Sequence, residues 1–219
     1  MILCFSGGVD SYIAWHYLGT PPTVYFQLGT KYSIKEQKVV EKLIPNTIID
    51  FSLDLESREL PNSYVPFRNL HLALLASKYD HQIIIVGLKD DMVEDKTPSA
   101  FGHMTACMNS IEKDKDYFVT SPFWHMTKEE IVAWYMKTVG DVYPLLRTVS
   151  CYSEEDTNYC GKCPSCFRKW VAFRSNRIEI EFYNHPLMKE YVSKARQGIY
   201  NEKRNIAILR EVERYGYTY

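Results

Sequence analysis

The sequence has no apolar run that approaches the roughly 20 residues needed to cross a bilayer. It also has almost no net charge, because 26 lysines and arginines stand against 27 aspartates and glutamates. No overall charge therefore draws the chain to nucleic acid or to an anionic membrane, although a local basic patch could still do so. Since the first residues resemble a strand more than a signal peptide, we expect a cytoplasmic protein that has no membrane partner and no nucleic acid as direct substrate.

Cysteine is scarce outside one short segment. Cys4 falls in an apolar strand and Cys107 in an expected helix, where a small buried hydrophobic side chain is the simplest interpretation. The other four cysteines form a C-x8-C-x2-C-x2-C pattern: Cys151, Cys160, Cys163 and Cys166. Clustered thiols in a cytoplasmic chain favour a metal over disulfides. Four thiolates suit a tetrahedral structural zinc ion with a closed coordination sphere, and an iron–sulfur cluster or unligated thiols are the alternatives.

Apolar strands alternate with helical patterns along most of the chain. We expect strands over 2–5, 23–28, 47–51, 82–87 and 117–121, with helices between them. This alternation with short connections is typical of an α/β fold, a parallel sheet of about five strands covered by helices on both faces, which binds ligands beyond the carboxyl ends of its strands. We expect this domain to span 1–148, with the zinc-binding loop and a C-terminal helical region packed on it over 149–219.

Helix-start signals place two cations in unfavourable positions. Ser33 to Glu36 and Thr127 to Glu130 both match a capping box, and Pro66 suits the first position of another helix. Arg68 and Lys128 then lie in first turns, where the helix dipole disfavours a positive charge. Each cation could face a phosphate or substrate, or a surface carboxylate or solvent.

Two further charged segments leave a functional and a simpler interpretation open. Asp90 or Asp91 could hold a metal or a substrate, or belong to a solvated loop. Arg168 and Lys169 stand between Phe167 and Trp170 and could touch a nucleotide, although ordinary helix packing with solvated charges explains them equally.

The segment Ser6-Gly7-Gly8-Val9-Asp10-Ser11 connects the first strand to the first helix. Two glycines allow a positive φ and a close approach of the backbone to a ligand. The first N–H groups of the helix point into the same turn, so the loop suits an anion.

This loop resembles the SGGxDS pyrophosphate loop of the PP-loop, or N-type, ATP pyrophosphatases, which share an adenine nucleotide α-hydrolase-like fold. Further matching segments occur along the chain: Leu60-Pro61-Asn62, Arg68-Asn69, Gly87, Ser150-Cys151-Tyr152 and Cys160-Gly161-Lys162-Cys163-Pro164-Ser165-Cys166. Together they make the chain similar to the 7-cyano-7-deazaguanine synthase family over residues 1–175.

The resemblance implies an ATP-dependent ligase. A substrate carboxylate attacks the α-phosphorus of ATP, pyrophosphate leaves, ammonia converts the acyl adenylate to an amide, and a second adenylation dehydrates the amide to a nitrile. The implied substrate is 7-carboxy-7-deazaguanine, on the pathway to queuosine, and the implied cofactors are ATP, Mg²⁺ and Zn²⁺.

The site residues follow from this resemblance and from their chemistry. Backbone N–H groups around Ser6, Gly7, Gly8 and Val9, with the Ser6 and Ser11 hydroxyls, would stabilise the departing pyrophosphate, and Gly87 would lie at the nucleotide site. Asp10 would repel a phosphate unless a cation intervenes, so we expect it to help hold Mg²⁺. Arg68 and Lys128 are candidates for neutralising phosphate or the substrate carboxylate.

Two segments depart from the family pattern. Phe67 stands where the family usually has a glycine, and residues 95–103 replace a Tyr-Pro-Asp-Cys-Arg segment associated with the deazapurine. The nucleotide half is intact, whereas the acceptor half is altered. The reaction could therefore stop at the amide, use a related acid, or modify a tRNA base or a protein. A non-catalytic nucleotide-binding module is the remaining alternative, and any of these could form a homodimer.

Overall fold

The computed structural model describes residues 1–153, 159–181 and 185–216. Its strands are β1 (Ile2–Cys4), β2 (Thr23–Phe26), β3 (Ile48–Asp50), β4 (Gln82–Ile84) and β5 (Phe118–Thr120). Its α-helices are α1 (Val9–Tyr17), α2 (Ser33–Leu43), α3 (Arg68–Ala76), α4 (Pro98–Ile111), α5 (Lys128–Thr138), α6 (Val142–Arg147), α7 (Pro164–Ser175), α8 (His185–Arg196) and α9 (Glu202–Arg214). Two short 3₁₀ helices, η1 (Glu56–Arg58) and η2 (Glu94–Lys96), complete the described elements. None of the helices in this described part has the length and apolar character that a membrane crossing requires.

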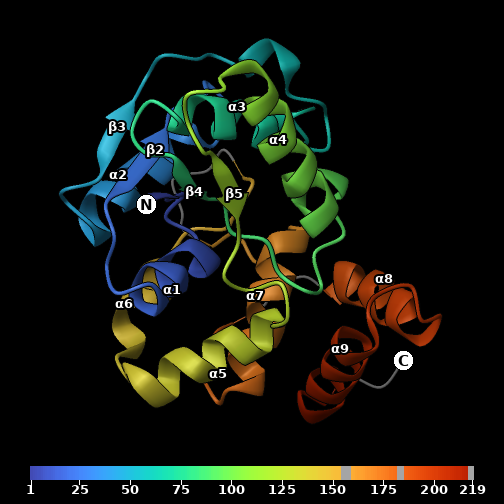
Figure 1. Cartoon of the computed structure of the whole chain (residues 1–219). Coiled ribbons are helices and arrows are strands. Elements are labelled where there is room, and N and C mark those ends of the chain that lie inside the picture. Colours follow the sequence, from blue (N-terminus) through green and yellow to red (C-terminus); the bar gives the residue numbers. More distant parts are fainter. Residues whose placement is uncertain (154–158, 182–184, 217–219) are drawn as a thin grey trace.

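The five strands form one parallel sheet, as the sequence predicts. Their order is β3-β2-β1-β4-β5, so β1 pairs with β2 on one side and with β4 on the other (Figure 1). The order of the strands reverses at β1, and a sheet of this kind opens a crevice at such a switch point. The loop that follows β1 therefore lies where the fold favours a ligand.

The sheet is buried on both faces because successive side chains of a strand point to opposite sides. Leu3 of β1 joins a cluster with residues of α1, α5 and α7, whereas Ile2 joins a cluster with residues of α3 and α4. Figure 1 shows α3 and α4 on one side of the sheet and α1 and α5 on the other. The predicted α/β architecture with helices on both faces is confirmed.

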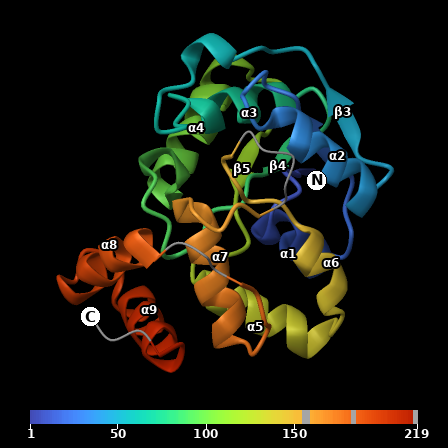
Figure 2. The same ribbon diagram turned by 180° about the vertical axis from the view of Figure 1, so that it is seen from behind.

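Helix α7 links the C-terminal helices to this core. Phe173 packs into the cluster under α1 and α5, while Trp170, one turn earlier, is buried in a third cluster with Met188 of α8 and Ile208 of α9. Cys151 and Cys166 belong to that third cluster. From behind, α8 and α9 lie beside α7, away from the sheet (Figure 2).

One predicted capping box is wrong. Tyr32, rather than Ser33, is the N-cap of α2, and no side chain caps it. The Ser33 hydroxyl instead lies 2.6 Å from that of Thr30, and the Glu36 carboxylate accepts a hydrogen bond from the Tyr25 hydroxyl of β2 at 3.3 Å. A tertiary contact therefore takes the side chain that a capping box would have used locally.

Helix α3 begins two residues later than Pro66 predicts. Its N-cap, Phe67, has φ 59° and ψ 19°, in the left-handed region. This conformation costs an L-residue about 1–2 kcal/mol because Cβ crowds the following carbonyl. The Phe67 side chain is 62% exposed, so few contacts offset the strain. The strained residue stands where the family has its glycine.

We expect Phe67→Gly to raise the free energy of unfolding by about 0.5–1 kcal/mol, because glycine adopts a positive φ freely and only part of the gain is lost to the entropy of the unfolded chain. For a chain of this length the thermal midpoint should rise by about 1–4 °C. Phe67→Ala is the control, since it removes the ring but keeps Cβ. A glycine variant no more stable than the alanine variant would show that the backbone is not strained.

Candidate functional site

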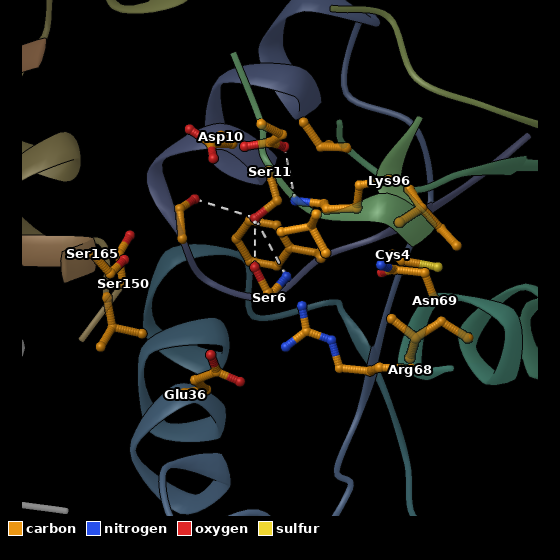
Figure 3. Close-up of a pocket in the computed structure, with 18 of the residues that line it drawn as sticks. Cys4, Ser6, Asp10, Ser11, Glu36, Arg68, Asn69, Lys96, Ser150 and Ser165 are labelled. Atoms are coloured by element: carbon orange, nitrogen blue, oxygen red, sulfur yellow. Dashed lines mark hydrogen bonds and ion pairs between the residues drawn. The ribbon is translucent and has the colours of Figure 1, made fainter. Parts of the chain in front are cut away.

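A pocket of about 360 Å³ opens at the carboxyl edge of the sheet (Figure 3). It is lined from the loop after β1, the ends of β2 and β4, helices α2 and α3, the cysteine segment, and α9. The predicted site residues in its lining are Ser6, Gly8, Asp10, Ser11, Arg68 and Lys128. Segments far apart in the sequence thus meet at the place that the fold favours for a ligand.

The loop after β1 is held in an open turn. Gly7 has φ +70°, and its carbonyl accepts a hydrogen bond from the Val149 N–H at 2.9 Å. The Ser6 and Ser11 hydroxyls lie 3.2 Å apart, and the Ser11 hydroxyl donates to the Gly8 carbonyl at 3.2 Å. Gly8, the N-cap of α1, has no side chain with which to cap the first turn. The first N–H groups of α1 are therefore available to an anion. Gly7 and the buried Val9 belong to this turn but not to the pocket lining.

Lys128 finds its anionic partner in Asp10. Its Nζ lies 2.7 Å and 2.9 Å from the two carboxylate oxygens of Asp10. Thr127 fixes the start of α5 through the predicted capping box, in which Thr127 N–H donates to the Glu130 carboxylate at 2.8 Å. The Lys128 side chain is only 5% exposed, so the loop after β1 and the start of α5 share one buried ion pair.

Asp90 and Asp91 do not belong to a solvated loop. Arg168 of α7 contacts both, with Nη2 2.9 Å from Asp90 Oδ2 and Nη1 2.5 Å from Asp91 Oδ1. Although burial raises the pKa of Asp91, Lys96 and Arg168 hold it well below its usual range. The Lys128 N–H also donates to Asp90 at 3.3 Å. Helix α7, which contains Cys166, is thereby fastened to the edge of the sheet.

Lys169, the neighbour of Arg168, is buried as well. Its Nζ donates to the Thr148 carbonyl at 2.8 Å and lies 3.0 Å from the Thr148 hydroxyl. Burial lowers the pKa of Lys169 to about 7. The interpretation of these two cations as solvated charges on a helix is wrong.

Arg68 and Glu36 face each other across the pocket. In Figure 3 the Arg68 guanidinium points toward Ser6 and Glu36. The beginning of α3 is fixed by Asn69, whose N–H and side-chain amide donate to Asp95 at 3.2 Å and 2.9 Å. Burial raises the pKa of Glu36 to about 7, and the positive charge of Arg68 offsets only part of this rise.

The raised pKa of Glu36 predicts a pH dependence. Between its ordinary value of 4.5 and about 7, the folded state binds more protons than the unfolded state, so stability falls as pH rises through this window. We expect Glu36→Gln to gain on the order of 2 kcal/mol relative to wild type between pH 5 and pH 8, measured by urea unfolding. Glu41→Gln, on an exposed position of α2, is the control and should follow wild type. Equal pH dependence in all three proteins would contradict the assignment.

The four clustered cysteines form a compact sulfur site. Their Sγ atoms all lie within 4.8 Å of one another, and those of Cys160 and Cys166 are 3.9 Å apart. A tetrahedral zinc ion with Zn–S bonds of about 2.3 Å requires sulfur atoms about 3.8 Å apart. The cluster is therefore compatible with a zinc site. Four thiolates also leave no coordination position open, as a structural site requires.

The remaining cysteines differ from expectation. Cys107 is exposed on α4, so its predicted burial is wrong, and Cys4 is half-buried in the lining of the pocket.

Gly87 lies beside the pocket and not in its lining. Its N–H donates to the Ser121 hydroxyl at 3.0 Å, and that hydroxyl donates to the Gly87 carbonyl at 2.7 Å. A Cβ at this position would come within 2.5 Å of the Trp124 ring. Packing against an aromatic ring thus accounts for the glycine, and a role in nucleotide binding stays a prediction.

Sequence reasoning missed several residues that line the pocket. Glu36 was assigned to a helix cap, and Arg204 lies in a C-terminal segment without a recognisable motif. Tyr32 and Tyr152 also face the site, with ring centroids 5.6 Å apart. Only the fold brings Tyr32, Glu36 and Arg204 to the pocket, whereas Tyr152 stands in the Ser150-Cys151-Tyr152 segment that the family resemblance marks.

A parallel sheet with a glycine-rich turn after its central strand, beside Lys128 and Arg68, fits an enzyme of the PP-loop ATP pyrophosphatase type, the class that the family match implies. The chain belongs to the QueC family, because the family model described as "Queuosine biosynthesis protein QueC" matches residues 23–177. This membership supports a role in queuosine or deazapurine biosynthesis. The match includes Arg68, Lys128 and the four cysteines but begins after the loop of residues 6–11, which is assigned from its own sequence and geometry.

Proposed function

We propose that this protein adenylates a carboxylate with ATP and then transfers ammonia to it, converting 7-carboxy-7-deazaguanine to 7-cyano-7-deazaguanine. The observation that carries the proposal is the meeting of the Ser6 to Ser11 loop with Arg68 and Lys128 in one pocket. Backbone N–H groups, hydroxyls and two cations then surround the place where a pyrophosphate would leave.

The loop would bind the β- and γ-phosphates through its N–H groups and the hydroxyls of Ser6 and Ser11. Lys128 would neutralise charge on the departing pyrophosphate, held in place by Asp10. The Asp10 carboxylate, whose side chain is 21% exposed, can also offer an oxygen ligand to Mg²⁺, which when bound would neutralise further phosphate charge. No side chain need act as a nucleophile, so orientation and electrostatics supply the catalysis.

The acid would take part in two bond exchanges. A carboxylate oxygen forms a bond to the α-phosphorus while the bond to the pyrophosphate oxygen breaks. Ammonia then attacks the acyl carbon and loses a proton, and AMP leaves with the bonding electron pair, which gives the amide. A second ATP would adenylate the amide oxygen with release of pyrophosphate, and AMP would then leave with that oxygen while the nitrogen loses its remaining two protons, which gives the nitrile. Arg68, whose guanidinium points into the pocket, would neutralise the acid or the α-phosphate during these steps.

The reaction can be tested with ATP, Mg²⁺, ammonium and 7-carboxy-7-deazaguanine, with products followed by mass spectrometry. We expect AMP with the amide or the nitrile, and Lys128→Met should lower kcat by about 100-fold because a buried cation facing the leaving group is lost. Lys137→Met, on an exposed position of the same helix, should match wild type. Absence of AMP and of both products from wild type would refute the proposed reaction.

We also propose that Cys151, Cys160, Cys163 and Cys166 hold one structural Zn²⁺. Protein purified without added metal should contain one zinc per chain. Cys163→Ser should lose zinc and thermal stability, because the ion would join Cys151, the turn of Cys160 and Cys163, and Cys166 of α7. Cys107→Ser, outside the cluster, should retain both. Elemental analysis measures the metal, and a wild type with clearly less than one zinc per chain would overturn the assignment.

A related enzyme with a changed acceptor is the second candidate, favoured by the segment over residues 95–103. Asp95 is bound by Asn69, and Lys96 lies 3.3 Å from Asp91, so these side chains serve contacts within the protein. Formation of AMP that requires a tRNA or a protein, and not the deazapurine acid, would support this candidate.

A further inference from the structure

Helix α9 lies outside the part of the chain that matches the QueC family, yet it contributes a side chain to the pocket. The match ends at residue 177, whereas Arg204 belongs to the pocket lining. The helix is fixed to α7 two turns after Arg204, where the buried Glu211 carboxylate accepts a hydrogen bond from the Ser175 hydroxyl of α7 at 3.3 Å. Arg204 is thus presented to the pocket by a well-anchored element.

The Arg204 guanidinium is held in place but not neutralised. It lies 4.1 Å above the centre of the Tyr200 ring, and its Nη1 donates to the Asp90 carbonyl at 3.3 Å. In the described part of the chain, no carboxylate forms an ion pair with Arg204. The nearby side chains of Asp90 and Asp91 pair with Arg168 instead. Burial and the nearby charge of Arg168 lower the pKa of Arg204, and the carboxylates of Asp90 and Glu129, neither of them ion-paired with it, offset only part of this fall.

The charge balance of the pocket points the same way. Among the described residues, its lining includes five cations and three carboxylates: Arg68, Lys96, Lys128, Arg168 and Arg204 against Asp10, Glu36 and Asp91. A half-buried guanidinium beside a second one is unfavourable unless an anion comes between or next to them. Arg204 is therefore a cation prepared for an anionic ligand group.

The position of Arg204 indicates which ligand this is. The pyrophosphate of ATP belongs at the loop after β1, whereas Arg204 contacts Asp90, which follows β4 on the neighbouring strand. In an in-line displacement the attacking group stands opposite the leaving pyrophosphate. Asp90 also accepts a hydrogen bond from the Lys128 N–H, while the Lys128 Nζ reaches Asp10, so Asp90 and the length of the Lys128 side chain stand between Arg204 and the loop after β1. The part of the pocket beside α9 and the loop after β4 is thus left for the acceptor.

We infer that Arg204 binds the carboxylate of the acceptor acid and orients it for attack, which makes α9 a specificity-determining wall of the active site. A guanidinium can hold a carboxylate through two parallel hydrogen bonds, which sets orientation as well as charge. This inference rests on the proposed function for the identity of the acid, 7-carboxy-7-deazaguanine.

The test compares wild type, Arg204→Ala, Arg204→Lys and Lys203→Ala. Lys203 is the matched control, because it precedes Arg204 and its exposed ion pair with Glu130 lies outside the pocket lining. We expect Arg204→Ala to raise KM for the acid at least tenfold with KM for ATP within about twofold, and Arg204→Lys to fall between. Lys203→Ala should behave as wild type. Thermal midpoints establish that α9 remains packed in each variant.

Calorimetric titration of the acid, with α,β-methylene-ATP present, separates this inference from the proposed reaction. If wild type binds the acid without turning it over, and Arg204→Ala weakens binding at least tenfold, the inference stands although the reaction fails. Unchanged KM and affinity in Arg204→Ala, or an equal rise of KM for ATP, would overturn the inference while leaving the reaction intact. Absence of both binding and turnover in wild type would overturn both.

Discussion

The buried carboxylate of Asp90 is the group on which the arrangement of the pocket depends. The carboxylate accepts a hydrogen bond from the Lys128 N–H at the start of α5 and forms an ion pair with Arg168 of α7. The backbone carbonyl of Asp90 accepts a hydrogen bond from Arg204 of α9. A buried charge is tolerated only when it is paired and hydrogen-bonded, so α5 and α7 must meet at this carboxylate, and α9 joins them through the Asp90 carbonyl. Lys128 is thereby positioned to contact Asp10 on the loop after β1.

The segment that contains the clustered cysteines lines another side of the pocket. Val149 donates a backbone hydrogen bond to Gly7, Tyr152 lies beside Tyr32, and α7 begins within the cysteine cluster, with Cys163 as its N-cap and Cys166 in its first turn. A metal bound by those cysteines would therefore act at a distance, by fixing where the segment crosses the edge of the sheet. This accounts for a closed sulfur site next to, and not within, the pocket.

Most of the fold can be predicted from the sequence, because the patterns that indicate its helices, strands and cysteine cluster are local. Alternating strand and helix patterns, the Thr127 capping box and the cysteine spacing each depend on a few neighbouring residues, and the structure has the corresponding elements. The capping box predicted at Ser33 does not form, because the Glu36 side chain binds the Tyr25 hydroxyl of β2 instead. The predicted start of α3 is wrong because Phe67 takes a strained, left-handed backbone conformation that no residue propensity favours.

The pocket was predictable only in part. Ser6 to Ser11, Arg68 and Lys128 could be named from helix-start chemistry and resemblance, and the structure brings Ser6, Asp10, Ser11, Arg68 and Lys128 together. Their partners could not be named, because the pairing of Lys128 with Asp10 joins residues 118 positions apart. Arg204 carries no local signal at all, and its place follows from the packing of α9 on α7.

The central claim is that the loop after β1 is where ATP places its pyrophosphate. A crystal structure with α,β-methylene-ATP and Mg²⁺ tests it most directly. We expect the β- and γ-phosphates on the N–H groups at the start of α1 and the Ser6 and Ser11 hydroxyls, with Lys128 and Asp10 beside them. Phosphates bound elsewhere in the pocket, with this loop empty, would contradict it.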